Sequence, residues 1–489
     1  MKYALKVSEK DNVVTVLSQV KKGETVSYLD NKEKREVVAQ NDIPIYHKIA
    51  IRDIKTDEDI VKYGENIGRA SVDIAKGSHV HTHNVKAHRE NLEEKEWGDK
   101  LRTFWGYRRE DGRVGIRNHV LILPASICTS DTTRLIASNL NGAVTFNLQL
   151  GCSQVGQDFE LTLDTLAGYG ANPNVYGVII VGLGCETAQA SLVKEKILER
   201  TKKPIETLVI QEEGGTLKTI AKAQSLAKKM IGEAALVKRE EFPLSELILG
   251  TNCGGSDTTS GIAANPTIGE VSDKLVAMGA TSVLCETTEF IGAEHILARR
   301  AKNKEVHDKL YEIINNYEEK IKHDTGLDVR DGNPSPGNIE GGLTTLEEKS
   351  LGCIHKGGSS IINNIYDYSK QIKGKEGLVI MDTPGNDASS VGGIIAGGCQ
   401  LVVFSTGRGT PTGHAIAPVI KITGNSETYA RMSDNIDYDA SKIITENKSI
   451  EQASEELLDL IVDVCNGKLV QAELLGYTET AIQRASAFV

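Results

Sequence analysis

The sequence lacks long apolar runs and is poor in aromatic residues. Only 5% of its 489 residues are Phe, Trp or Tyr, and no stretch approaches the roughly 20 apolar residues that a membrane-spanning helix needs. The start, MKYALKVSEKDN, is interrupted by three lysines and is not typical of a signal peptide. We therefore expect a cytoplasmic protein with no membrane partner.

Paired cysteines are also absent. The sequence contains no Cys-x-x-Cys motif and no cysteine before residue 128. This spacing fits neither a secreted disulfide framework nor a zinc finger, so free thiols in a reducing compartment are expected. The eight cysteines are Cys128, Cys152, Cys185, Cys253, Cys285, Cys353, Cys399 and Cys465.

Several common catalytic motifs are missing. Neither the full Gly-x-Gly-x-x-Gly nor Gly-x4-Gly-Lys-Ser/Thr occurs, which disfavours nicotinamide and ATP enzymes. No Gly-x-Ser-x-Gly nucleophile elbow is present, so a hydrolase triad has no support.

The charge balance is acidic. There are 56 Lys and Arg against 67 Asp and Glu, which gives a formal net charge of −11. An acidic surface offers no general attraction to nucleic acid, so small molecules are the favoured partners. A content of 39% hydrophobic and 25% charged residues is typical of a folded chain with large cores.

The pattern along the chain predicts three domains. The first 95 residues hold short alternating stretches, such as VVTV at 13 to 16, and no long helical period, which predicts an all-β domain. Within it, residues 51–64 and 71–84 resemble two copies of one turn-and-strand unit. Later, short apolar runs alternate with helical segments, as in α/β regions with mainly parallel sheets. Charge and Pro243 interrupt this pattern, so we divide the chain into 1–95, 96–245 and 246–489.

Polar, Gly-rich loops follow four of the predicted parallel strands. In open α/β sheets, ligands bind in the crevice beyond the carboxyl ends of the strands, so these loops are candidate binding sites. Ordinary βα turns are the alternative. Arg408 in GRGTP is a candidate carboxylate clamp, or otherwise a structural ion pair. The remaining polar candidates are Glu186, Cys253, Ser256, Asp257, Asn386 and Asp387.

Histidines alternate in GSHVHTHN. On a strand, His79, His81 and His83 would project from one face with neighbours about 7 Å apart. Imidazole binds iron, manganese or zinc, so two of them could share a metal ion, although a solvated histidine strand is the alternative. His47 and Lys48 open another predicted strand.

Collinear motifs extend these observations over nearly the whole chain. They are KYGENIG (62–68), GSHVHTHN (77–84), DGRVGIRN (111–118), GCSQ (151–154), GLGCE (182–186), CGGSDTTSGIAANP (253–266), NPSPGN (333–338), GGLTTLEEKSLGC (341–353) and FSTGRGTP (404–411). Together they resemble the altronate/galactarate dehydratase family. The resemblance implies an N-terminal SAF domain of the β-clip type, a divalent metal, usually Fe²⁺ or Mn²⁺, and removal of water from a hexonate or hexarate.

Within that family, GSHVHTHN, TPGND (383–387) and SLGC resemble the altronate-specific members. The implied reaction converts D-altronate to 2-dehydro-3-deoxy-D-gluconate. One departure is Leu148-Gln149-Leu150 before Gly151, where the family pattern has His and Tyr. Galactarate or another sugar acid remains an alternative substrate.

The implied chemistry assigns roles to the candidate residues. A metal that chelates the carboxylate and a hydroxyl acidifies the C2 hydrogen, and loss of the C3 hydroxyl then gives an enol. Metal ligands are expected among His79, His81 and His83. Catalytic candidates are His47, Lys48, Glu186, Asp257 and Arg408; substrate-binding candidates are Cys152, Cys253, Ser256, Asn386, Asp387 and Arg408.

Two other functions remain open. One is an iron–sulfur dehydratase with Cys128, Cys152 and Cys185 as ligands, which would be brown. The other is a non-catalytic sugar-acid binding protein. A homo-oligomer is compatible with the sequence. The metal-assisted reaction requires that the histidine-bearing β-domain packs over the loops around residues 186, 257 and 408.

Overall fold

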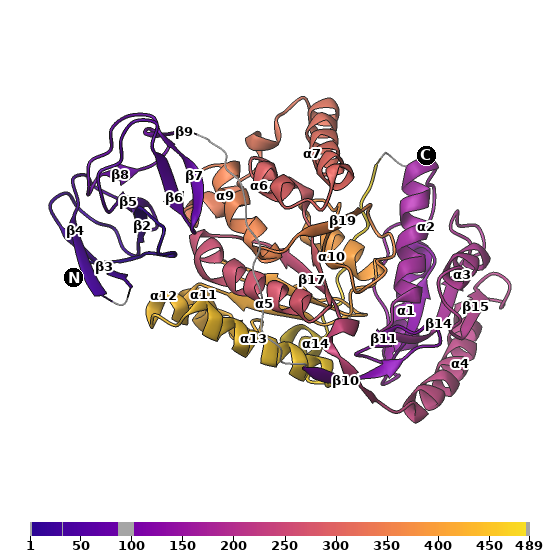
Figure 1. Cartoon of the computed structure of the whole chain (residues 1–489). Helices are drawn as coiled ribbons and strands as arrows, with labels where there is room; N and C mark the ends of the chain where they lie inside the picture. Colours follow the sequence, from indigo (N-terminus) through magenta and orange to yellow (C-terminus); the bar gives the residue numbers. More distant parts are fainter. Residues whose placement is uncertain (1, 32, 87–101, 486–489) are drawn as a thin grey trace.

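The computed structural model describes residues 2–31, 33–86 and 102–485. The domain boundary predicted near residue 95 lies outside these ranges. Within them the chain forms an all-β N-terminal module, a smaller α/β region and a larger α/β region (Figure 1). The prediction of an all-β N-terminal domain followed by α/β regions with mainly parallel sheets is confirmed. No helix among the described residues combines the length and apolarity needed to cross a membrane.

The N-terminal module consists of two sheets, with strand orders β4-β3-β1-β2-β5-β8 and β6-β7-β9. Among the described strands of this module, only β1 and β3 pair in parallel. Small aliphatic side chains fill two compact cores, because alternate residues of these short strands point inward. The strands are β1 (Lys2–Leu5), β2 (Val13–Val16), β3 (Thr25–Asp30), β4 (Glu33–Val38), β5 (Lys48–Ala50), β6 (Asp59–Lys62), β7 (Glu65–Ala70), β8 (His79–Val80) and β9 (Val85–Lys86).

The second region is built on a four-stranded parallel sheet of order β13-β12-β14-β15. Its strands are β12 (His119–Pro124), β13 (Ala143–Val144), β14 (Val175–Gly182) and β15 (Ile205–Val209). Its helices are α1 (Ser130–Ala137), α2 (Gly156–Ala171), α3 (Ala190–Leu198) and α4 (Thr216–Leu236). A small antiparallel sheet, order β11-β10-β16, joins β10 (Thr103–Arg108), β11 (Val114–Gly115) and β16 (Glu240–Pro243).

The C-terminal region contains a seven-stranded parallel sheet of order β19-β20-β18-β17-β21-β22-β23. Its strands are β17 (Ile248–Cys253), β18 (Thr281–Leu284), β19 (Ile362–Tyr366), β20 (Gly377–Met381), β21 (Leu401–Ser405), β22 (Val419–Thr423) and β23 (Tyr438–Asp439). Its helices are α5 (Asn265–Ala277), α6 (Glu294–Arg299), α7 (Lys304–Thr325), α8 (Pro336–Glu340), α9 (Leu346–Cys353), α10 (Asp387–Ala396), α11 (Ser426–Arg431), α12 (Lys442–Thr445), α13 (Ile450–Cys465) and α14 (Gln471–Leu475).

The two α/β regions share one core. Side chains of β12 and β14 belong to the same buried cluster as those of β20 and β21. Asn172, at the end of α2, donates to the carbonyl oxygens of Ile395 (2.8 Å), in the last turn of α10, and of Cys399 (3.0 Å), just after that helix. These buried bonds fix the orientation of the second region against the larger sheet.

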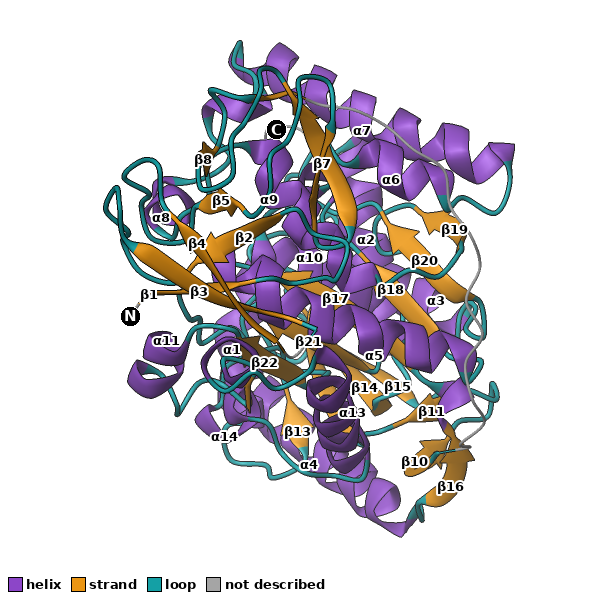
Figure 2. Cartoon of the chain, turned by 60° about the vertical axis from the view of Figure 1, so that its left-hand side comes forward, coloured by secondary structure: helices purple, strands orange, loops and turns teal. Residues whose placement is uncertain are grey.

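The N-terminal module packs on the opposite side of the C-terminal region. Figure 1 shows it at the left, beside α9, with β14 and α4 at the far right. Figure 2 brings its strands to the front. The rings of Tyr63 in the module and His355, just after α9, meet edge to face with centroids 5.2 Å apart. The seam between the module and α9 is the first place to look for a site.

Candidate active site at the seam of the N-terminal module

Three histidines converge on the module face that borders α9. His47 directly precedes β5 and His79 begins β8, and these strands pair antiparallel. His47 Nδ1 lies 3.0 Å from His79 Nε2. One ring nitrogen from each of His47, His79 and His81 falls within 4.8 Å of the other two. Among the described residues this histidine trio is the one group of three potential ligands that close together.

Repeated turns explain why His47 and His79 meet. An Asp-Ile pair precedes each strand, at Asp42-Ile43 and at Asp73-Ile74. Both isoleucines are buried. Each aspartate accepts a backbone N–H from a distant turn, Asp42 from Lys22 and Asp73 from Thr56, both at 2.8 Å. The two similar turns therefore place His47 and His79 at corresponding positions, at the starts of the adjacent strands β5 and β8.

The expected strand through residue 83 is wrong. β8 ends at Val80, because Asn84 closes a turn: its Oδ1 accepts the N–H of His81 at 2.9 Å, and its own N–H donates to the His81 carbonyl. His83 lies outside the trio, although its ring centroid is 5.4 Å from that of His79. His47, rather than His83, is the third histidine of the trio.

The seam keeps its imidazoles neutral. Burial, reinforced by neighbouring histidines and Lys48, lowers the pKa of both His47 and His79 to about 4. Burial also lowers the pKa of His81. At neutral pH these rings therefore carry free lone pairs, which is the form that binds metal ions.

Next to the trio lies a buried ionic group contributed by both sides of the seam. Lys48 Nζ is 3.0 Å from Glu348 Oε1 on α9, and the Thr344 hydroxyl donates to Glu348 Oε2 at 2.6 Å. Although burial raises the pKa of Glu348, the ammonium groups of Lys48 and Lys62 lower it further, to well below its usual range. Glu348 is thus the counter-ion of two buried lysines.

A cavity of about 220 Å³ opens between the module and α9. Its lining includes Lys48, Lys62, Tyr63, His81 and Glu348. Burial lowers the pKa of Lys62 and raises that of Tyr63, so the phenol stays protonated. Two cations, neutral imidazoles and a phenol around one cavity can bind a small anion and move protons.

A second buried cluster lies at the carboxyl edge of the seven-stranded sheet. It contains the predicted residues Cys253 and Asp387 together with Glu286, Cys353 and Lys356. Lys356 Nζ contacts Cys253 Sγ at 2.7 Å and Glu286 Oε2 at 3.0 Å, and the two sulfurs are 3.5 Å apart. The hydrogen bond from Cys353, with help from the Lys356 ammonium, lowers the pKa of Cys253 to about 5. Burial and the Cys253 thiolate raise the pKa of Asp387 to about 7.

The side chains of Asp257 and Arg408 are committed to contacts within the protein, and the backbone carbonyl of Ser256 accepts from Asn338 Nδ2 at 2.8 Å. The Asp257 carboxylate accepts from Thr259 (2.6 Å), Ser260 and Asn425 (2.9 Å). Arg408 pairs with Glu340 at 3.0 Å, which matches the structural ion pair considered as its alternative role. Asn386 caps α10 by accepting the N–H of Ser389 at 3.1 Å.

Glu186 and Cys152 do not join the seam within one chain. Both belong to the second region, on the far side of the C-terminal region from β8 (Figure 1). The Glu186 carboxylate accepts the backbone N–H groups of Leu183 (3.0 Å) and Gly184 (2.6 Å), so it stabilises its own loop. Within one chain, the histidines therefore do not lie over the loop around residue 186. The loop around residue 257 does approach the module, since an added Cβ on Gly342 would meet Tyr46 Cβ at 3.2 Å and Thr258 Oγ1 at 2.7 Å.

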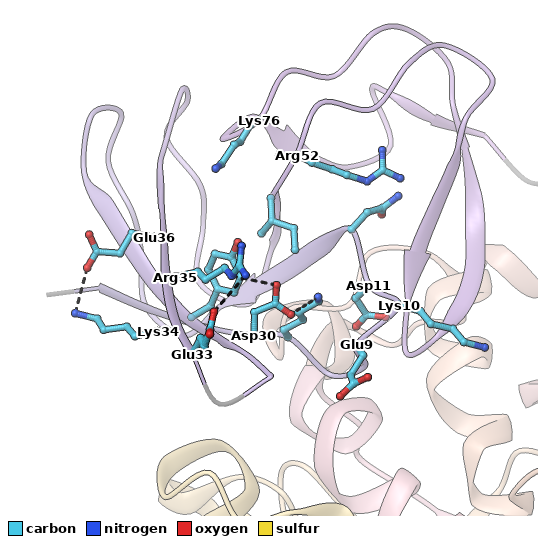
Figure 3. Close-up of a pocket in the computed structure, with 14 residues that line it drawn as sticks. Glu9, Lys10, Asp11, Asp30, Glu33, Lys34, Arg35, Glu36, Arg52 and Lys76 are labelled. Carbon is cyan, nitrogen blue, oxygen red and sulfur yellow. Dashed lines mark hydrogen bonds and ion pairs between the residues drawn. The ribbon is translucent and has the colours of Figure 1, made fainter.

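A larger hollow, of about 800 Å³, lies on the other face of the module. Figure 3 shows that some of its charged side chains pair with one another. Asp30 contacts Lys6 at 2.7 Å and Arg35 at 3.6 Å, and Lys34 contacts Glu36 at 3.1 Å. Because acidic as well as basic side chains line it, this hollow is a weaker candidate for an anionic ligand.

Comparison with protein families shows to which family the chain belongs. Residues 2–88 match the altronate/galactarate dehydratase SAF domain, 106–235 the D-galactarate dehydratase/altronate hydrolase second domain, and 244–487 the D-galactarate/altronate dehydratase C-terminal domain. The chain belongs to the altronate/galactarate dehydratase family. The predicted family membership, SAF domain and hydro-lyase class are confirmed.

Three relatives place the chain within related lyases. It is 36% identical to the altronate dehydratase of Bacillus subtilis (strain 168) over 99% of both chains. It is also 36% identical to the altronate dehydratase of Escherichia coli (strain K12) over 98% of both. The beta subunit of (2R)-sulfolactate sulfo-lyase from Chromohalobacter salexigens is 39% identical over 79% of this chain and 98% of its own length.

Some site residues escaped prediction. Glu286 directly follows the apolar run that ends at Cys285, so the strand-end rule could have found it. Lys62 and Glu348 belong to the motifs KYGENIG and GGLTTLEEKSLGC, but no spacing or strand-end rule singles them out, nor Lys356. Their importance depends on which elements dock against each other.

Proposed function

We propose that this family member dehydrates D-altronate to 2-dehydro-3-deoxy-D-gluconate at the seam, with Fe²⁺ or Mn²⁺ held by His47, His79 and His81. The observation that carries the proposal is the convergence of three neutral imidazoles beside a cavity lined by two lysines. The near full-length similarity to two altronate dehydratases supports the choice of substrate. The reduced state expected of the cysteines fits a cytoplasmic enzyme.

The donor set fits a first-row divalent metal ion. Imidazole nitrogens bind iron and manganese, although less tightly than they bind copper. Three imidazole ligands would leave coordination positions on the ion for a carboxylate and a hydroxyl of the substrate. When bound, such an ion supplies Lewis acidity that makes the C2 hydrogen of a 2-hydroxy acid more acidic. The ligands need no deprotonation at neutral pH, because burial already holds them neutral.

The other seam residues then supply binding and proton transfer. The Lys48 ammonium, oriented by Glu348, binds the substrate carboxylate. Lys62, whose pKa burial lowers, loses its ammonium proton to solvent before the reaction and then accepts the C2 proton as a neutral amine. Tyr63, whose ring lies 4.5 Å from Lys62 Nζ, donates a proton to the departing C3 hydroxyl, which leaves as water. Return of the proton from Lys62 to Tyr63 restores both groups, and the enol tautomerises to the 2-keto-3-deoxy acid.

A substrate panel tests the proposal. The full chain is incubated anaerobically with Fe²⁺ or Mn²⁺ and D-altronate, galactarate or (2R)-sulfolactate, and 2-keto acid and sulfite are measured. The proposal predicts the largest kcat/KM with D-altronate and its loss without metal. Turnover of galactarate or sulfolactate alone would contradict the substrate assignment.

Matched variants test the site. Lys62→Met and Tyr63→Phe should each lower kcat at least a hundredfold, the usual contribution of general acid–base catalysis. Lys76→Met, in the same module but on the charged hollow, should leave kcat unchanged. A wild-type kcat in Lys62→Met would show that Lys62 does not take part in the proton transfer.

A further inference from the structure

Two cysteines that lie 100 residues apart in sequence meet at the carboxyl edge of the seven-stranded sheet. Cys253 ends β17 and Cys353 ends α9, and their sulfurs are 3.5 Å apart. Both residues are buried. Buried cysteines usually act as small, inert apolar side chains. The charged groups around this pair indicate a different role.

A lysine ammonium contacts one of the two sulfurs directly. Lys356 Nζ lies 2.7 Å from Cys253 Sγ and 3.0 Å from Glu286 Oε2, and the lysine is fully buried. Burial and the Cys253 charge raise the pKa of Glu286 well above its usual range, so its carboxyl does not neutralise Lys356. The hydrogen bond from Cys353, together with Lys356, lowers the pKa of Cys253 to about 5. Cys253 is therefore a thiolate at neutral pH.

The other sulfur remains a thiol. Its hydrogen bond with Cys253 and its burial raise the pKa of Cys353 well above the usual value. Cys353 Sγ also lies 3.5 Å from Glu289 Oε2, and the other oxygen of this carboxylate pairs with Lys349 Nζ at 2.8 Å. Glu289 is thus placed to accept the thiol proton when Cys353 reacts.

The backbone beside this pair is strained. Glu286 has a φ of +73°, in the left-handed region that non-glycine residues rarely occupy. Its Oε2 accepts the backbone N–H of Cys253 at 2.8 Å as well as a proton of the Lys356 ammonium. Backbone strain of this kind concentrates at functional sites, and here it accompanies the contact between a lysine and a sulfur.

A metal ion is a poor occupant of this cluster. The Lys356 ammonium already contacts Cys253 Sγ, and a positive charge at that distance opposes a bound cation. Among the described residues, the one group of three potential ligands within 4.8 Å of one another is the histidine trio. A thiolate next to a second thiol is instead the arrangement found in cysteines that oxidants convert to disulfides.

The pair lies just below the surface. Cys253 is followed by the partly exposed Gly254 and the exposed Gly255. An added Cβ on Gly254 would meet Oδ2 of the partly exposed Asp387 at 2.2 Å, so polar groups border this side of the thiolate. An oxidant close to water in size, such as hydrogen peroxide, has a short path from solvent here. A disulfide bond measures about 2.05 Å, so the sulfurs must approach each other by about 1.5 Å.

We propose that Cys253 and Cys353 form a modification site that hydrogen peroxide converts to a disulfide. The Cys253 thiolate attacks one peroxide oxygen, which forms the S–O bond of a sulfenic acid and breaks the O–O bond. The departing hydroxide takes a proton from Lys356 and leaves as water.

The second thiol then resolves the sulfenic acid. Glu289 takes the Cys353 proton, and the Cys353 sulfur displaces hydroxide from the Cys253 sulfur, which forms the S–S bond and breaks the S–O bond. That hydroxide takes the proton from Glu289 and leaves as a second water, while Lys356 regains its proton from solvent. Each sulfur gives up one electron, and the peroxide is reduced to two waters.

Peptide mapping of the full chain tests this site. Reduced, metal-free protein is treated at pH 7 with hydrogen peroxide, the peroxide is removed with catalase, and free thiols are alkylated in denaturant. The proposal predicts a cross-linked Cys253–Cys353 peptide, two hydrogens lighter than its separate parts, that dithiothreitol reverses. Cys465 is an internal control, because it is also buried but its pKa is raised to about 12. Cys253 should be oxidised at least tenfold faster than Cys465.

Two serine variants separate the two steps. In Cys353→Ser, where the hydroxyl can still donate to Cys253, the sulfenic acid should accumulate and react with dimedone. In Cys253→Ser, Cys353 should remain a thiol. Circular dichroism checks that both variants are folded, and the wild-type map decides the matter if either is not.

The result is independent of the D-altronate assignment, because it is read from thiols and mass rather than from turnover. Neither sulfur belongs to the histidine trio or lines the cavity between the module and α9. Peroxide-treated wild type in which both thiols persist, or in which Cys253 and Cys465 are oxidised at the same rate, would overturn the proposal. Oxidation of Cys353 at the wild-type rate in folded Cys253→Ser would do the same.

Discussion

Removing the Glu348 carboxylate should open the seam. Lys48 and Lys62 are 7% and 3% exposed, and Glu348 is the acid that pairs with the first and lies in the field of both. Breaking a buried ion pair on one side costs about 3–5 kcal/mol, because the remaining charge is left unpaired. We therefore expect Glu348→Gln to lower the free energy needed to separate the N-terminal module from α9 by about 3 kcal/mol.

Hydrogen exchange measures this opening in the intact chain. Amides of β5 and β8 should exchange about a hundredfold faster in Glu348→Gln, since each 1.4 kcal/mol is a factor of ten. The control is Glu36→Gln on the same module, whose partner Lys34 is half exposed and whose solvent-screened ion pair should contribute little to stability. Adding Lys48→Met to Glu348→Gln should restore part of the protection. Equal exchange in the Glu348 and Glu36 variants would refute the reasoning.

Two further predictions concern buried groups outside the seam. Lys356→Met should lower the free energy of unfolding in urea by about 3 kcal/mol, because it leaves the Cys253 thiolate without its buried counter-ion and Glu286 without its hydrogen bond from Lys356; an unchanged urea midpoint would contradict this. Burial lowers the pKa of His355 from 6.5 to about 4, so the unfolded state binds a proton between pH 6.5 and 4 that the folded state does not. As the pH is lowered through that window, protonation of this group in the unfolded state should therefore lower the free energy of unfolding by about 1.4 kcal/mol per pH unit. His355→Gln should show a shallower loss on acidification than the wild type, and parallel pH profiles would count against it.

The sequence predicted those parts of the site that depend on local pattern. His47, Lys48, His79 and His81 could be found because they follow repeated turns or alternate along a predicted strand. His83 was misplaced because the turn closed by Asn84 ends β8 after two residues. A short polar side chain that caps a turn is hard to distinguish from one that simply continues a strand.

The local sequence pattern could not predict how the domains dock against each other. The strand-end rule selected Glu186 and Asp387 alike, although Glu186 follows a strand of the four-stranded sheet and Asp387 follows a strand of the seven-stranded sheet. Each sheet has its own carboxyl edge, and periodicity does not show which edge faces the N-terminal module. For the same reason the role of Glu348 in α9, although the residue belongs to the motif GGLTTLEEKSLGC, could be seen only with the module placed against it.

Mn²⁺ binding measured by electron paramagnetic resonance tests the seam most directly, because Mn²⁺ is paramagnetic and favours oxygen and nitrogen ligands over sulfur. We predict one bound Mn²⁺ per chain whose spectrum changes on addition of D-altronate. His81→Ala should weaken this binding at least tenfold, whereas His307→Ala, which removes an exposed histidine of α7, should not. Undiminished Mn²⁺ affinity in His81→Ala would contradict the account.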